Sequence, residues 1–291
     1  MKRRANELAI AAALLYTAVV MFPIAWMAIT AIKHPSDTAL RPPRFIPASE
    51  SPPQTYKFEV SALNFSSQFK NPDILGYLLN SVFVAAASTI VSVFLGAFAA
   101  YGFSRFRLAG SNDWQFFILS TRMLPALAVS VPISWMYAKA NQWTGMPVLM
   151  DSPLGLILLY TCFNLSFSTW MMKAFIDEIP SSYEEAALLD GYSRAQVLFR
   201  IILPQASTGL LATAVFCLIA AWNEYAFALT LTQTNAVTMP VYLHGVIGDT
   251  SKVPWGRLAA GASVFMLPIV VFSLLMRKHL LRGITFGAVK G

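Results

Sequence analysis

The chain has few charged side chains. Asp, Glu, Lys and Arg make up 12% of its 291 residues, whereas soluble domains carry about 25%. Hydrophobic residues make up 56% and the mean hydropathy is +0.58, so polar side chains are too few to cover a surface that faces water. With aromatic residues at 13%, a disordered chain is excluded as well. The composition indicates an integral membrane protein.

Cysteine, histidine and phosphate-binding motifs are scarce or missing. The two cysteines, Cys162 and Cys217, lie in apolar runs and imply neither a disulfide framework nor a zinc site. The three histidines show no ligand spacing, so we expect no metal site and no Ser-His-Asp set. The sequence also lacks a G-x-x-x-x-G-K-[ST] loop. We therefore expect a chain that is not an enzyme and does not hydrolyse ATP itself.

Six apolar stretches are long enough to cross a bilayer, which takes about 20 residues per helix. They are residues 8–32, 77–104, 114–138, 152–172, 208–232 and 257–277. The third and fifth each contain one ionisable residue, Arg122 and Glu224. Prolines inside the stretches are compatible with kinked helices in a bundle. The sequence predicts an all-α membrane protein with six transmembrane helices.

The first stretch could also be a cleavable signal peptide, because Lys2, Arg3 and Arg4 precede it. An apolar core of about 7 to 15 residues is typical of signal peptides. The stretch at 8–32 is longer and has no small-residue cleavage site before Lys33. We therefore predict a retained first helix.

Basic residues predict the orientation, because they accumulate in cytoplasmic loops. With the N-terminus inside, twelve Lys and Arg residues fall in inner segments and eight in outer ones. Five of those eight lie in the outer loop at 33–73, where the rule weakens. That loop is rich in proline, and we expect it to be irregular. Both termini, and the tail at 278–291, are predicted to be cytoplasmic.

The cytoplasmic loop at 173–207 carries two helix-start patterns. Ser182 with Glu185, and Ser193 with Gln196, both fit a capping box. Gly191 lies between them and suits the left-handed conformation that ends a helix. The loop is thus predicted to hold a short helix, a glycine turn and a second helix that runs to Leu203-Pro204.

Two other interpretations of this loop fit its residues less well. A DNA-binding helix-turn-helix is disfavoured, because both ends are tethered to membrane spans and the loop is net acidic. A solvated connector would not need the run Ala186 to Leu189 beside paired glutamates. Small residues next to acidic groups suit docking into a protein groove lined with donors or basic side chains.

These residues match a known signature. Glu185-Ala186-Ala187, then Gly191, Ile201 and Leu203-Pro204 occupy every fixed position of the EAA motif, so the chain resembles ABC importer permeases. The carbohydrate-uptake branch, of which the maltose permease is a member, is similar over essentially the whole chain. Further matching segments are Thr121 to Pro125, Ala221 to Glu224 and Gly287 to Gly291.

The resemblance implies a type I ABC importer permease fold with cytoplasmic coupling helices between spans four and five, in a bacterial inner membrane. It also implies a second homologous permease, a dimer of ATP-binding subunits that hold ATP and Mg²⁺, and an extracytoplasmic solute-binding protein. The expected substrate is a carbohydrate or a polyol. Membrane lipid is a further expected partner, and nucleic acid is not. The residues implied to contact the ATPase are Glu184, Glu185, Ala186, Ala187, Asp190 and Gly191 in the loop, and Val289, Lys290 and Gly291 in the tail.

The translocation pathway is less well marked. Arg122 and Glu224 are costly inside a bilayer and should face protein or water. An ion pair between them is the obvious hypothesis, although helix rise puts them about 12 Å apart in depth. Each could instead be structural. Trp222 lies deeper than the other tryptophans, and the amide of Asn223 suits a sugar hydroxyl, so Arg122, Trp222, Asn223 and Glu224 are candidate pathway residues.

A proton-coupled secondary transporter is the alternative function, with Arg122 and Glu224 as a proton relay. The EAA motif and the lack of a visible second half of similar hydropathy disfavour it. The identity of the sugar or polyol does not follow from these residues.

Overall fold

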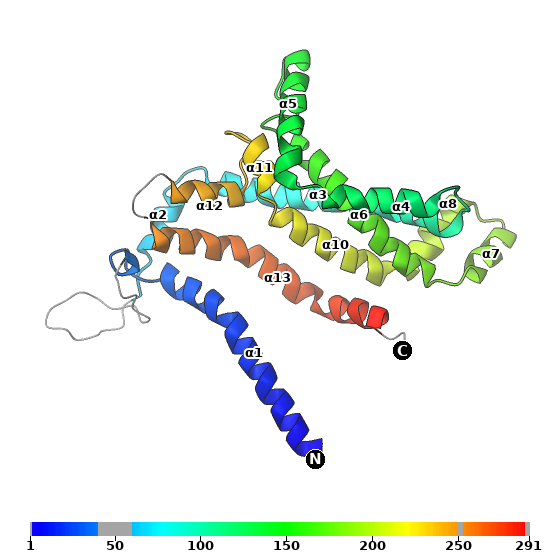
Figure 1. The fold of residues 1–291 in the computed structure, drawn as a ribbon, viewed down its shortest axis with the longest axis horizontal. Helices are drawn as coiled ribbons and strands as arrows, with labels where there is room; N and C mark the ends of the chain where they lie inside the picture. The colour runs from blue at the N-terminus through cyan, green and yellow to red at the C-terminus, as the bar shows by residue number, and fades with distance from the viewer. Residues whose placement is uncertain (1, 40–59, 249–252, 289–291) are drawn as a thin grey trace. The chain divides into compact units, whose positions relative to one another are not determined.

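The computed structural model describes residues 2–39, 60–248 and 253–288, and every regular element in these ranges is a helix (Figure 1). The chain divides into two compact units, described separately below. One comprises Met1–Leu75 and Tyr242–Pro268, and the other Gly76–Val241 and Ile269–Gly291.

The first unit contains α1 (Lys2–Ala31), η1 (Asp37–Ala39), α2 (Leu63–Phe69) and the first part of α13 (Trp255–Ala288). Its small core joins Ala31 to Ala259 and Ala260. The buried amide of Asn64 donates to the carbonyls of Ala31 (3.1 Å) and Lys33 (2.7 Å). A Cβ at Gly256 would collide with Asn64, so glycine permits this approach. Within the outer loop predicted to be irregular, a helix therefore forms, because Asn64 fixes it to the end of α1.

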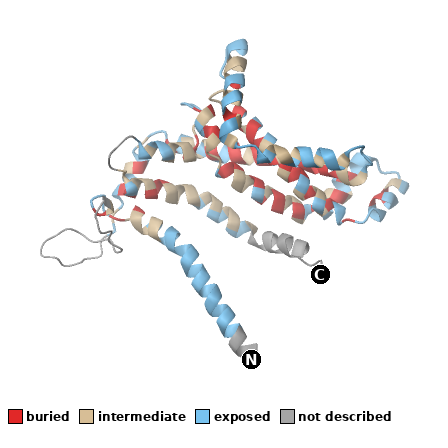
Figure 2. Ribbon diagram, viewed as in Figure 1, coloured by how far each residue is buried: buried red, intermediate tan, exposed pale blue. Residues whose placement is uncertain are grey.

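The second unit is built around two long helices, α3 (Ile74–Arg105) and α6 (Pro153–Asp177). α10 packs on α6, and α11 packs against both α5 and α6. Buried residues concentrate on α6 and α10, whereas most of α1 is exposed (Figure 2). The remaining elements of the unit are α4 (Ser111–Ser120), η2 (Thr121–Met123), α5 (Ala126–Thr144), α7 (Ser182–Leu189), α8 (Arg194–Val197), η3 (Leu198–Ile202), α9 (Leu203–Gln205), α10 (Ser207–Trp222), α11 (Ala226–Leu231) and most of α12 (Met239–Ile247).

By length and composition, four helices among the described residues can cross a membrane, or up to six if each of two bent pairs is one span. Their apolar segments are Asn6–Ala31, Ile74–Arg105, Pro153–Asp177 and Trp255–Met276.

The first bent pair occupies the stretch predicted as the third span. Ser111–Met123 and Ala126–Thr144 are bent by 92°, and α5 turns away from α4 (Figure 1). The bend has a local cause, because a residue that precedes proline avoids the helical conformation. Leu124 has an extended ψ of 130°, and Pro125 precedes the first residue of α5. The sequence predicts only a kinked helix at this proline, whereas in the structure the helix is broken there.

The stretch predicted as the fifth span, 208–232, is also divided. α10 ends at Trp222, and α11 begins at Ala226 after a break that the sequence did not indicate. The second bent pair of 77° lies before it, between Arg194–Gln205 and Ser207–Trp222. At the other end of the chain, α13 continues to Ala288, so most of the predicted tail is helical. Val289, Lys290 and Gly291 lie outside the described residues.

Candidate functional site

α7 begins differently from its prediction. The residue before the helix is Ser181, which is itself in helical conformation, and no side chain caps the helix. The capping box predicted for Ser182 and Glu185 is therefore wrong. Both glutamates of the first turn still stabilise the helix start, because negative charge near an N-terminus complements the helix dipole.

α7 ends as predicted. Gly191 has a φ of +86°, the left-handed conformation that glycine adopts without strain. The Gly191 N–H donates to the Leu188 carbonyl (3.1 Å), and the Tyr192 N–H donates to the Ala187 carbonyl (3.0 Å). This pair of bonds is a Schellman motif, and it turns the chain sharply after α7.

The second predicted capping box is confirmed. The Gln196 N–H donates to the Ser193 hydroxyl (3.3 Å), and the Ser193 N–H donates to the Gln196 side chain (2.8 Å). The helix that follows passes through the π-helical turn η3 before α9. Pro204 lies in α9 and has no N–H for a helical bond, which fits a local change of helix type at this point.

The two faces of the α7 turn differ. Glu184 and Ala187 are buried against the chain itself, at 4% and 5% exposure. Leu189, at the tip, is 89% exposed. The residues on the exposed side are Tyr183, Glu185, Ala186, Leu189, Asp190 and Gly191. Of the six residues implied to contact an ATPase, four are accessible and two are internal.

Glu184 is held inside by residues that the sequence analysis did not single out. Its carboxylate pairs with the Arg105 guanidinium and accepts a hydrogen bond from the Tyr101 hydroxyl at 3.1 Å. Both partners belong to the end of α3. In the sequence, Arg105 is recognisable only as a basic residue at the cytoplasmic end of a predicted span. Counting such residues predicts the orientation in the membrane, but it does not identify the partners of a single side chain.

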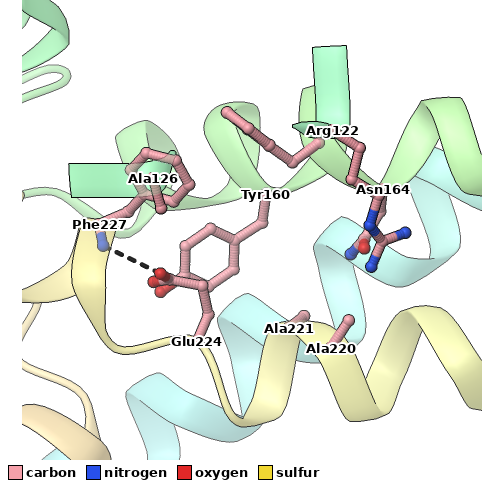
Figure 3. A pocket seen from close by; sticks show the side chains of 9 residues that line it. Arg122, Ala126, Tyr160, Asn164, Ala220, Ala221, Glu224 and Phe227 are labelled. Atoms are coloured by element: carbon pink, nitrogen blue, oxygen red, sulfur yellow. Dashed lines mark hydrogen bonds between the residues drawn. The ribbon is translucent and has the colours of Figure 1, made fainter. Parts of the chain in front are cut away.

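A pocket of about 170 Å³ lies where η2, α5, α6, α10 and α11 meet. Figure 3 shows Arg122 and Asn164 at one end, and Tyr160 beside Glu224 at the other. Asn164 donates to the Cys217 carbonyl (3.3 Å), and its amide oxygen is a further hydrogen-bond acceptor in the pocket lining. The full lining comprises Arg122, Ala126, Tyr160, Phe163, Asn164, Ala220, Ala221, Glu224 and Phe227.

The pocket brings together two of the four candidate pathway residues, Arg122 and Glu224, but not as an ion pair. The Glu224 carboxylate accepts from the backbone N–H groups of Phe227 (2.9 Å) and Ala228 (3.2 Å). The Arg122 guanidinium lies over the Phe167 ring at 5.1 Å. The ion-pair hypothesis is wrong, because the start of α11 supplies the partners of Glu224.

The other two candidates do not line this pocket. Trp222 is buried at 5% exposure, and Asn223 is exposed and donates back to the Ile219 carbonyl (2.9 Å). Tyr160 and Asn164 were missed, because polar residues in a span classified as apolar gave no charge signal.

A second polar cluster surrounds Asp151, between α5 and α6. Its carboxylate accepts from the backbone N–H groups of residues 233–236 and from the side chains of Thr234 and Asn235. Burial raises the pKa of this carboxyl, but the hydrogen bonds from Gln233, Asn235, Thr234 and Ala236 outweigh it and lower the pKa to about 2. Asn80 donates to the carbonyls of Asn235 and Val237, so the segment between α11 and α12 is fixed from two sides.

Long apolar helices, a polar-lined pocket between them and an exposed helical turn together define an α-helical membrane transport subunit. Residues 92–285 match the family described as the binding-protein-dependent transport system inner membrane component. The chain belongs to this family. It is a multi-pass inner-membrane permease of an ABC transporter, which works with a binding protein and ATPase subunits and is not itself the ATPase. Because the chain belongs to this family, the alternative function as a proton-coupled secondary transporter is rejected.

Relatives extend along nearly the whole chain. It is 33% identical to the trehalose transport system permease protein SugB of Mycobacterium tuberculosis, over 87% of this chain and 89% of the relative. It is 30% identical to the trehalose/maltose transport system permease protein MalG of Thermococcus litoralis, over 98% of this chain and 96% of the relative. The fold resembles a chain in the crystal structure of a bacterial ABC transporter for the acidic polysaccharide alginate, with a TM-score of 0.74 and 19% identity over 96% of this chain and 97% of that one. The predicted ABC importer permease fold is confirmed.

Proposed function

We propose that this permease forms half of the translocation pathway for a carbohydrate or polyol that a solute-binding protein delivers. The part of the proposal that concerns coupling to the ATPase rests on the exposed side of α7. Leu189 and Glu185 lie on a turn that is exposed among the described residues, as expected for a helix that inserts into a partner. The substrate class is supported by the sugars named for the relatives, trehalose and maltose.

The proposed complex contains a second homologous permease and a dimer of ATP-binding subunits, which hold ATP and Mg²⁺. Glu185, Ala186, Asp190 and Gly191 contact the ATPase, while Glu184 and Ala187 position them from within. The tail at Val289, Lys290 and Gly291 approaches the same partner. Both termini and residues 173–207 are cytoplasmic in this arrangement, and residues 33–73 face outward.

The pocket suits a sugar ring on its way through the membrane. Arg122, Asn164 and Tyr160 offer donors and acceptors, and Phe163 and Phe227 offer apolar ring faces. Its volume of about 170 Å³ is below the roughly 300–1,000 Å³ of sites for drug-sized ligands, so one ring fits better than an oligosaccharide. Trp222 and Asn223 flank this position along the proposed path.

The proposal is tested with the complete complex in proteoliposomes. A thermal-shift screen of the purified binding protein against sugars and polyols first identifies the substrate. Uptake of that compound should then require ATP inside the vesicles and should fall at least tenfold with Leu189→Asp, since a charge replaces the exposed apolar tip. Leu108→Asp, at an exposed apolar residue between α3 and α4, controls for added charge. Binding only of non-carbohydrate solutes, or ATP-independent uptake, would reject the proposal.

A further inference from the structure

The side chain of Arg105 joins three segments that are separate in the sequence. From the end of α3, its Nε donates to the Glu184 carboxylate in the first turn of α7. Its terminal nitrogen donates to the carbonyls of Ile176 (3.0 Å) and Ile179 (2.7 Å), at and just beyond the end of α6. One guanidinium thus holds the ends of α3 and α6 and the start of α7 together.

The chemistry of this node requires arginine. Guanidinium presents five N–H donors in a planar fork, whereas a lysine ammonium is a compact point charge. A positive group also complements the negative end of the α6 dipole, as Glu184 complements the positive end of α7. With Glu184 at 4% exposure and Tyr101 at 6%, the node is shielded from water, which strengthens its hydrogen bonds.

The node sits on a continuous core. Ile176 of α6, Ala187 of α7 and Ile202 of η3 belong to one buried cluster with residues of α3. The complete cluster is Ala97, Ala100, Tyr101, Met172, Ile176, Ile179, Ala187, Val197, Leu198, Ile202 and Ala206. Apolar contacts oppose separation of these elements but are non-directional. The directed bonds of Arg105 are therefore what fixes the orientation of α7 on this cluster.

We propose that Arg105 is a positioning residue that makes α7 a rigid extension of α3 and α6. A displacement of α7 by the ATPase then reaches both membrane helices as one movement, without bending at the connector Glu178–Ser181. This inference rests on the proposed docking of α7. It assigns adjacent glutamates opposite roles, Glu184 to the permease interior and Glu185 to the partner.

The test measures whether α7 moves relative to α3 in the assembled complex. Spin labels at Leu95 of α3 and Ser182 of α7, with Cys162 and Cys217 changed to alanine, report one distance in lipid nanodiscs. The wild-type distance should stay narrow and unchanged between the nucleotide-free and the ATP–vanadate state. With Arg105→Ala the distribution should broaden and shift with nucleotide. Arg107→Ala, two residues further and exposed, is the matched control and should behave as wild type.

Enzymatic coupling gives the second readout. Arg105→Ala should lower the stimulation of ATP hydrolysis by the binding protein at least fivefold and leave basal hydrolysis unchanged, whereas failed assembly would lower both. Arg105→Lys should restore stimulation only in part, because it keeps the charge but not the fork. If Arg105→Ala does not assemble, Arg105→Lys and Tyr101→Phe supply the same comparison.

The charge-swapped double variant R105E/E184R separates the node from an ordinary ion pair. A glutamate at 105 cannot donate to the Ile176 and Ile179 carbonyls, so the swap should not restore the narrow distance. Full restoration by the swap, or a wild-type distribution in Arg105→Ala, would overturn the inference. Failure of the proposed docking of α7 would give a different result. The ATPase would then co-purify with the Leu189→Asp variant at wild-type yield. The distance between the spin labels in the nucleotide-free state would still test the role of Arg105.

Discussion

Asp151 shows how one side chain can organise a segment more than eighty residues away. Asp151 itself has a positive φ of 55°, which is unusual for a residue with a side chain. Its carboxylate collects the N–H groups of residues 233–236. An ionised acceptor shared among several donors is the stronger kind of hydrogen bonding, so the segment before α12 depends on this charge.

The change Asp151→Asn should loosen that segment. The amide keeps the shape but loses the charge, and its NH₂ group would face donors. We expect a loss of about 2 kcal/mol in local stability, which corresponds to roughly 30-fold faster hydrogen exchange at residues 233–236. Lys139→Gln, on neighbouring α5, is the control. Unchanged exchange in Asp151→Asn would show that the segment is fixed by Asn80 alone.

The same carboxylate predicts a dependence on pH. Its pKa in the folded chain is about 2, below the ordinary value of 3.8. A lowered pKa means that its contribution is complete above about pH 4. The contribution is then lost as the pH falls through about 2. Exchange at residues 233–236, corrected for intrinsic rates, should accelerate in that window and not between pH 5 and 8.

Glu224 and Asn223 are neighbours with separable roles. Because the Glu224 carboxylate accepts from two N–H groups in the first turn of α11, Glu224→Ala should cost about 1 to 2 kcal/mol and reduce the yield of assembled complex. Asn223→Ala removes only a bond to the preceding turn and should assemble normally. Yields are compared by size-exclusion chromatography of the purified complex. Equal yields of the two variants would contradict the capping role.

At the scale of elements, the turn after α7 depends on one backbone conformation. In Gly191→Val, a branched side chain would have to adopt a φ of +86°, at a cost of about 1–2 kcal/mol or more. The Schellman bonds of α7 should weaken, and stimulated ATP hydrolysis should fall while the helices still insert. Gly102→Val, at a glycine with no atom near its missing Cβ, serves as control. Wild-type stimulation in Gly191→Val would refute the role of the turn.

Local patterns explain which elements could be predicted. Gly191 and the Ser193 capping box depend on neighbours within a few residues, so their structure followed from the sequence. The break after Trp222 did not, because hydropathy cannot distinguish a continuous span from two helices joined at a side-chain cap. The opposite faces of Glu184 and Glu185 also required tertiary contacts, since the partners of Glu184 lie about eighty residues earlier in α3.

For the whole molecule, the orientation in the membrane is the testable quantity. With residues 33–73 outside and 173–207 inside, a cysteine at Ser61 should react with a membrane-impermeant maleimide in intact cells. A cysteine at Ser181 should react only after permeabilisation. Both positions are at the surface or partly exposed in the structure. Labelling of Ser181 in intact cells would reverse the predicted topology.

The opposite roles proposed for Glu184 and Glu185 limit how long the connector before α7 can be. Each added residue turns a helix by about 100°, so one insertion between Ile179 and Ser182 would bring a different residue to face Arg105. With Ile179 held in place, that residue would be Tyr183, which cannot pair with the guanidinium, and Glu184 would be turned away from Arg105. Length variation should therefore be tolerated after Gly191, where the chain has already turned, and be damaging before Ser182.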